Sequence, residues 1–175
     1  MKKIKLFDYQ EDMVKRVQEA FKHHDAVMVQ MPTGTGKTMV LANIVFSFLE
    51  KCNHPIWIVA HRRELVVQIE ETLARFDLPT STDDDTAFIK VMSIQWLTLH
   101  YREMREVPSL IVIDEAHHAV AKTYAEVMRA FPKAKKLGLT ATPYRLNGKG
   151  FTDLFDTLLC SWSMEKFIAE RSEER

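Results

Sequence analysis

The sequence predicts an α/β domain, in which a mostly parallel central sheet is covered by helices on both faces. Short apolar runs alternate with helical patterns along most of the 175 residues, and such alternation is typical of a doubly wound domain. Several runs are apolar nearly throughout, as expected of strands that are covered on both faces. The predicted strands are Ala26–Gln30, Ile56–Ala60, Phe88–Met92, Leu110–Ile113 and Leu137–Thr140.

Helical patterns precede and separate these strands. Asp8 followed by Glu11 is typical of a helix cap with its return partner, and predicts a helix that runs to about Lys22. A second helical pattern follows the first strand, with Val40, Leu41, Ile44, Val45, Phe48 and Leu49 on one broad apolar face. A third follows the second strand, with Leu65, Val66, Ile69, Leu73 and Phe76 on its apolar face.

Composition excludes several classes of protein. Lys and Arg total 24 and Asp and Glu total 24, so no strongly basic field indicates nucleic acid, and such a partner must be held by local patches. Cys52 and Cys160 lie far apart without a CxxC pair, which argues against a disulfide scaffold or a structural zinc site. No apolar run approaches the ~18 residues of a membrane span, and no signal-peptide core follows Met1. We therefore expect a cytoplasmic protein with no membrane partner.

The strongest motif is the run Met31-Pro-Thr-Gly-Thr-Gly-Lys-Thr38, which lies between a predicted strand and a predicted helix. A nucleotide phosphate chain needs backbone N–H groups that converge at a helix N-terminus, and glycines permit that close approach. The lysine would neutralise the β- and γ-phosphates, and the final threonine hydroxyl would bind Mg²⁺. Met31 departs from the Gly or Ala that usually begins this pattern, and a Gly/Thr turn with a surface lysine is the alternative. The residues expected to bind ATP here are Thr33, Gly34, Thr35, Gly36, Lys37 and Thr38.

A second motif is Leu110-Ile-Val-Ile-Asp-Glu-Ala-His117, in which a buried strand ends in two carboxylates. In α/β sheets ligands bind at the carboxyl edge, so Asp114 and Glu115 are expected at a site there. Asp114 can hold Mg²⁺ through water, and Glu115 can orient and deprotonate an attacking water. One alternative is a helix N-terminus whose acids only complement the dipole. Another is a metal site formed by His117 and His118, although adjacent residues point to different faces.

The order of PTGTGKT, DEAH and Thr140-Ala-Thr-Pro143 resembles motifs I, II and III of superfamily 2 helicases in the DEAH-spelled group. Tyr9-Gln10 resembles the upstream glutamine element of that family, and the run from Val59 to Gln68 resembles its motif Ia. The His-Arg-Arg-Glu-Leu spelling and the TATPYRLNGKGF run are more similar to the DNA repair-helicase and restriction-translocase branch than to RNA DEAD-box proteins. The resemblance implies a RecA-like P-loop NTPase fold.

The resemblance also implies roles for single residues. Tyr9 and Gln10 would contact adenine, since an amide can pair with adenine N6 and N7; a capping-turn glutamine in water is the alternative. Thr140, Thr142 and His117 would couple hydrolysis to lobe movement, unless the threonines only stabilise a turn with the following proline.

Nucleic-acid contacts are implied for Arg62, Arg63, Ser93 and Gln95. The two arginines open a predicted helix just after a strand, where helix N–H groups and guanidiniums together favour a phosphate backbone. A solvated arginine pair is the alternative.

By this resemblance, residues 1–160 form the first helicase lobe and residues 161–175 begin a linker towards an absent second RecA-like lobe. We expect an enzyme, the motor lobe of an ATP-dependent helicase or translocase that uses Mg²⁺ and moves on DNA rather than RNA. The isolated lobe should have weak activity or none, because the opposite lobe supplies the arginine finger. The alternatives are a P-loop kinase of a small molecule and a non-hydrolysing ATP-gated nucleic-acid-binding module.

Overall fold

A computed structural model of the protein describes residues 6–32, 36–51, 55–78, 80, 88–115, 122–141 and 154–160. Its helices are α1 (Asp8–Ala20), α2 (Lys37–Lys51), α3 (Arg63–Arg75), α4 (Ile94–His100) and α5 (Lys122–Ala130). Its strands are β1 (Ala26–Gln30), β2 (Ile56–Ala60), β3 (Ile89–Ser93), β4 (Leu110–Asp114), β5 (Lys135–Thr140) and β6 (Thr157–Cys160).

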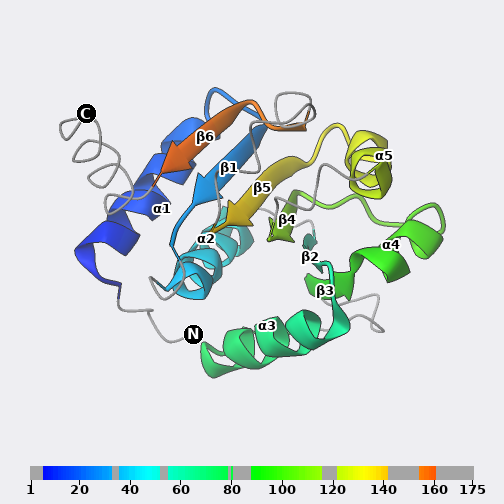
Figure 1. The fold of residues 1–175 in the computed structure, drawn as a ribbon, viewed down its shortest axis with the longest axis horizontal. Coiled ribbons are helices and arrows are strands. Elements are labelled where there is room, and N and C mark those ends of the chain that lie inside the picture. The colour runs from blue at the N-terminus through cyan, green and yellow to red at the C-terminus, as the bar shows by residue number, and fades with distance from the viewer. Residues whose placement is uncertain are drawn as a thin grey trace, which may run out of the picture.

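The described strands form one sheet in the order β3-β2-β4-β5-β1-β6, and every neighbouring pair is parallel. Helices α1, α2 and α3 cover one face of the sheet, and α4 and α5 cover the other (Figure 1). The predicted α/β fold with a parallel central sheet is therefore confirmed. Because all strands run in the same direction, their carboxyl ends share one edge, where ligands bind in such folds.

Two apolar cores explain why the central strands are apolar nearly throughout. Alternate residues of a strand point to opposite faces, so Ile58 packs below α1–α3 while Trp57 and Val59 pack below α4 and α5. Trp57 is fully buried and its ring lies edge-on against Phe131 at 4.8 Å. Strands β1, β2 and β4 contribute apolar residues to both cores. They are thus covered from both sides, which fixes the position of their carboxyl ends.

The start of α1 differs from the prediction. Asp8 is the first helical residue rather than the cap, and Phe7 occupies the N-cap position. Gln10, not Glu11, returns to the cap, because its Oε1 accepts a hydrogen bond from Phe7 N–H at 3.0 Å. The helix also ends earlier than predicted, at Ala20.

Two helices and one strand were not predicted. Helices α4 and α5 have only 7 and 9 residues, too short for a clear periodic pattern. Strand β6 is a four-residue edge strand that pairs with β1, and Arg16 of α1 donates a hydrogen bond to its Cys160 carbonyl oxygen at 2.7 Å. Within the described part of the chain, no helix has the length and apolar character needed to cross a bilayer.

Candidate nucleotide-binding site

Lys37 lies at the centre of the candidate site. It is the first residue of α2, and its ammonium group reaches across to the end of β4. Lys37 Nζ lies 2.6 Å from Glu115 Oε1 and 3.2 Å from Asp114 Oδ1, with all three side chains partly buried. The structure therefore brings together the lysine of the first motif and both acids of the second.

The charge of Lys37 is stabilised by this arrangement. Burial disfavours the ammonium form, but the charge of Asp114 and the hydrogen bond to Glu115 outweigh it, so the pKa of Lys37 is raised above its ordinary value. A permanently charged lysine between two carboxylates is suited to a ligand that brings both phosphates and a divalent cation. The phosphates can then replace the carboxylates as partners of Lys37, and the cation can replace Lys37 as the partner of the carboxylates.

Gly36 of the phosphate loop lies against Gln10 of α1. Its φ is +79°, a left-handed conformation that L side chains rarely adopt. A Cβ on Gly36 would collide with Nε2 of Gln10, whose side chain is only 3% exposed. The glutamine therefore caps α1 and also lies against the phosphate loop. The alternative of a capping glutamine in water is thus correct about the cap, but the side chain is buried and not in water.

Among the described residues of the site, Glu115 also has an unusual backbone geometry. Its φ is +51°, and a non-glycine residue in this region carries strain of roughly 1–3 kcal/mol, which is found most often at functional sites. The turn directs the carboxylate of Glu115 to Lys37 from just beyond the end of β4.

The residues present fit Mg²⁺ and a nucleotide. Magnesium in such sites is usually held by one or two carboxylates together with phosphate oxygens, and Asp114 provides a carboxylate beside Lys37. Thr38 follows on the first turn of α2, whose N-terminus is a favourable place for an anion. Thr33, Gly34, Thr35, His117, His118 and Thr142 lie outside the described residues.

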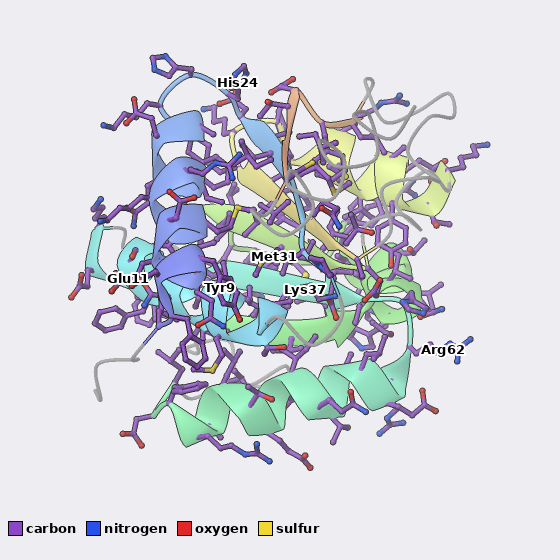
Figure 2. All side chains as sticks on the ribbon, turned by 60° about the vertical axis from the view of Figure 1, so that its left-hand side comes forward. Tyr9, Glu11, His24, Met31, Lys37 and Arg62 are labelled. Carbon is purple, nitrogen blue, oxygen red and sulfur yellow. The ribbon has the colours of Figure 1, made fainter. Side chains whose placement is uncertain are left out.

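The unusual Met31 has a structural explanation. Its side chain is fully buried in the core below α1–α3, so it fills space that a glycine or alanine would leave empty. Its N–H donates to the carbonyl oxygen of Thr140 at 2.9 Å, which connects the start of the phosphate loop to the end of β5. Thr140 is itself buried. Figure 2 shows Tyr9 at the lower end of α1 and His24 beyond its upper end.

The residues expected to contact nucleic acid gather at the ends of β2 and β3, which are neighbours in the sheet. Arg62 occupies the N-cap position of α3 and Arg63 is its first residue, and both are exposed. Arg62 extends away from the molecule in Figure 2. Ser93 Oγ accepts from Trp96 N–H at 3.2 Å, so it caps α4. Gln95 is exposed and donates to the carbonyl oxygen of His61 at 3.1 Å, which connects α4 to the loop before α3.

Three residues near the site were not predicted. Phe7 is 70% exposed and its ring stacks on Tyr9 with centroids 6.0 Å apart. Tyr124 of α5 is buried, and burial together with the charge of Asp114 raises its pKa. Gln30 is buried at the end of β1. A polar residue at the end of an otherwise apolar strand was the available signal for Gln30, whereas Phe7 and Tyr124 fit ordinary helical patterns.

Comparison with known proteins places this site in a helicase context. The chain is 30% identical over 152 residues to the DNA 3'-5' translocase XPB2 of Sulfurisphaera tokodaii, covering 84% of this chain and 33% of the relative. It is 28% identical over 178 residues to the putative ATP-dependent helicase IRC3 of Saccharomyces cerevisiae, covering 88% and 26%. The helicase domain of Hef from Pyrococcus furiosus has a similar structure, with a TM-score of 0.71 and 26% identity, over 87% of this chain and 37% of that one.

The chain thus spans only about a quarter to a third of the length of these curated relatives. A family model described as the type III restriction enzyme, res subunit, matches residues 3–145. That match includes the phosphate loop and both acids of the site. The chain therefore belongs to the family of type III restriction enzyme res subunits.

Proposed function

We propose that this chain is the ATP-binding motor lobe of an ATP-dependent DNA helicase or translocase, in the DEAH-spelled group of superfamily 2. The observation that carries the proposal is the contact of Lys37 with Asp114 and Glu115, at 3.2 and 2.6 Å, on the carboxyl edge of a parallel sheet. Family membership and the helicase relatives support it. A cytoplasmic location is part of this proposal, since the cysteine pattern suits a reducing compartment.

In this proposal ATP supplies the phosphoryl group, and Mg²⁺ would neutralise the negative charge of its phosphate oxygens. Lys37 binds the β- and γ-phosphates, Thr38 and Asp114 hold the cation, and Glu115 accepts the proton of the attacking water. Glu115 Oε1 lies 2.6 Å from Lys37 Nζ. A γ-phosphate bound to Lys37 would compete with this contact and leave the Glu115 carboxylate to act as the base, which links the base to occupancy of the site.

Adenine is bound by Tyr9 and Gln10 in this proposal. Gln10 lies directly against Gly36 of the phosphate loop, and the exposed ring of Phe7, stacked on Tyr9, offers an adjacent aromatic surface. The Oε1 atom of Gln10 accepts a hydrogen bond from Phe7 N–H. An amide oxygen has two lone pairs, so the same atom can also accept from adenine N6.

The nucleic-acid track is proposed to cross the ends of β2 and β3, over Arg62, Arg63, Ser93 and Gln95. The exposed arginines at the N-terminus of α3 favour a phosphate backbone. The name of XPB2 as a DNA translocase supports DNA rather than RNA. Thr140, Thr142 and His117 would couple hydrolysis to movement.

We propose further that residues 1–160 form the first lobe, that residues 161–175 begin a linker, and that a second RecA-like lobe completes the ATP site. The greater length of the relatives supports this.

The test uses the longer protein with its second lobe. ATP hydrolysis should rise when DNA is added, and Arg62→Ala with Arg63→Ala should weaken DNA binding and that stimulation. Arg75→Ala, at the other end of α3, is the matched control and should change neither. If the rate of ATP turnover did not change with DNA but rose with a small-molecule phosphate acceptor, the protein would be a kinase instead.

A further inference from the structure

A pocket lies between the C-terminal halves of α1 and α2, away from the candidate nucleotide-binding site. This α1–α2 pocket has a volume of about 470 Å³, which is within the usual range of ligand pockets. Lys37 begins α2, and Lys51, which lines the pocket, ends it. At 1.5 Å per residue the two lie about 21 Å apart along the helix. Because a helix between parallel strands returns to the amino edge of the sheet, the pocket lies at the edge opposite to Lys37.

The apolar lining of the α1–α2 pocket is held in place by contacts between the two helices. The ring of Phe21 is buried and packs edge-on against the ring of Phe48, with centroids 5.7 Å apart. Both rings pack in the core below α1–α3. Gln18 Nε2 donates a hydrogen bond to Ser47 Oγ at 3.2 Å, and both residues also line the pocket. An apolar group that enters can therefore cover aromatic surface that is already ordered, which lowers the entropy cost of binding.

The α1–α2 pocket carries an excess of positive charge. Three exposed lysines line it, Lys15, Lys22 and Lys51, together with the acidic residue Glu19. Glu19 is paired with Lys22 at 3.0 Å. Within the described part of the chain, neither Lys15 nor Lys51 has a carboxylate partner. Since the chain as a whole has equal numbers of acidic and basic residues, this excess is a local property of the pocket.

The helix ends explain only part of this charge. Lys22 and Lys51 lie at the C-terminal ends of α1 and α2, where cations complement the helix dipole. Lys15 lies in the middle of α1, more than a turn from its end, so the dipole does not account for it. Lys15 and Lys22 both line the pocket and are seven residues apart, which extends the positive charge over about 10 Å along α1.

These dimensions and charges favour an acidic peptide as the ligand. One small anion cannot contact lysines about 10 Å apart, whereas an extended peptide covers that distance with about three residues. Its carboxylates would pair with the lysines through charge-assisted hydrogen bonds, and an apolar side chain between them would enter against Phe21 and Phe48. The backbone of duplex DNA offers negative charge but no apolar group that enters a pocket.

We propose that the α1–α2 pocket is a docking site for an acidic segment of a partner protein, in which carboxylates flank an apolar side chain. Lys15 and Lys51 bind the carboxylates, and the paired rings of Phe21 and Phe48 bind the apolar side chain. Docking at the amino edge leaves the carboxyl edge of the sheet accessible. The inference is independent of the proposed function, because no residue of the pocket belongs to the nucleotide-binding site or to the proposed nucleic-acid track.

Calorimetric titration of the protein with the blocked peptide acetyl-Asp-Glu-Phe-Glu-Asp-amide tests this inference. The variant Lys15→Gln with Lys51→Gln removes two positive charges from exposed side chains of the pocket. The matched control is Lys122→Gln with Lys133→Gln, which removes the same charge from exposed lysines at and just beyond the ends of α5, on the other face of the sheet. A second peptide, with alanine in place of phenylalanine, tests the apolar contact.

We expect Lys15→Gln with Lys51→Gln to weaken peptide binding by at least about tenfold at low salt, and the control variant to bind as the unmodified protein does. The alanine peptide should also bind at least about tenfold more weakly, because burial of a phenylalanine side chain contributes more free energy than that change requires.

Equal affinities of the two lysine variants would overturn the inference, because the overall charge and not the pocket would then attract the peptide. Equal affinities for the two peptides would overturn the apolar contact and with it the docking site. Failure of the unmodified protein to bind the phenylalanine peptide would also contradict the inference. If the pocket variant instead lost affinity for a DNA duplex while the control variant kept it, the pocket would be a nucleic-acid site and the inference would be wrong.

Discussion

Replacing Gly36 with alanine should disturb α1 and the phosphate loop together. Gly36 has a φ of +79°, and a Cβ at this position would collide with Nε2 of Gln10. Gln10 cannot move without losing its hydrogen bond to Phe7 N–H at 3.0 Å. The single methyl group of Gly36→Ala therefore acts on the backbone at one residue and on the helix cap at another.

The magnitude follows from these two effects. A left-handed conformation costs a non-glycine residue roughly 1–2 kcal/mol. Losing the hydrogen bond between Gln10 and Phe7 costs about 0.5–1.5 kcal/mol. We expect Gly36→Ala to lower the free energy of unfolding by about 1.5–3.5 kcal/mol in total, and to weaken ATP binding because the loop must change its path.

A double-mutant cycle with Gln10→Ala separates the two effects, with stability measured by urea unfolding. Gln10→Ala removes the obstacle to the new methyl group, so in the Gln10→Ala background Gly36→Ala should add only the backbone cost. The two substitutions should therefore be less destabilising together than their sum, by about 1 kcal/mol. Strict additivity would refute the contact between Gln10 and the loop, and an unchanged stability of Gly36→Ala would refute the backbone geometry as well.

Three further predictions concern base choice, chemistry and acid stability. Gln10→Ala should narrow the preference for ATP over GTP, mainly by weakening ATP about tenfold, in competition titrations. Glu115→Gln should retain Mg²⁺·ATP but lower single-turnover hydrolysis by about 10²–10⁴ in the two-lobed protein, whereas Asp114→Asn should raise the Mg²⁺ concentration required. The hydrogen bond from Lys135 at 2.7 Å lowers the pKa of Asp25 from its ordinary value. Its stabilising effect is therefore present above the unfolded-state pKa and lost as pH falls through the lower folded-state pKa. Asp25→Asn should remove this part of the acid dependence of thermal unfolding.

The central strands could be predicted from sequence because burial on both faces leaves them apolar nearly throughout. The same reasoning began β5 at Leu137 and missed Lys135 and Lys136. Lys136 is buried in the strand because its long side chain reaches the carbonyl oxygen of Phe131, where Nζ donates at 2.7 Å. Strand β6 escaped prediction because an edge strand of four half-exposed residues has no distinct pattern.

The sequence was sufficient to predict which motifs meet at the candidate site. It was less informative about the side-chain contacts that these motifs make there. Lys37, Asp114 and Glu115 follow strands that end at one edge, so parallel topology alone brings their motifs to one side of the sheet. The contact between Gln10 and Gly36 depends on side-chain packing between elements far apart in the sequence. No local pattern encodes such contacts.

The central claim is that the Lys37 cluster binds the phosphates of Mg²⁺·ATP, and calorimetric titration of Lys37→Met tests it most directly. Charge-assisted hydrogen bonds contribute about 1.5–3 kcal/mol each, so the affinity should fall by at least about tenfold. Lys51→Met, at the opposite end of the same helix, serves as the control and should bind as the unmodified protein does. If Lys37→Met bound Mg²⁺·ATP as tightly as that control, the nucleotide would not lie on this cluster, and the account would be wrong.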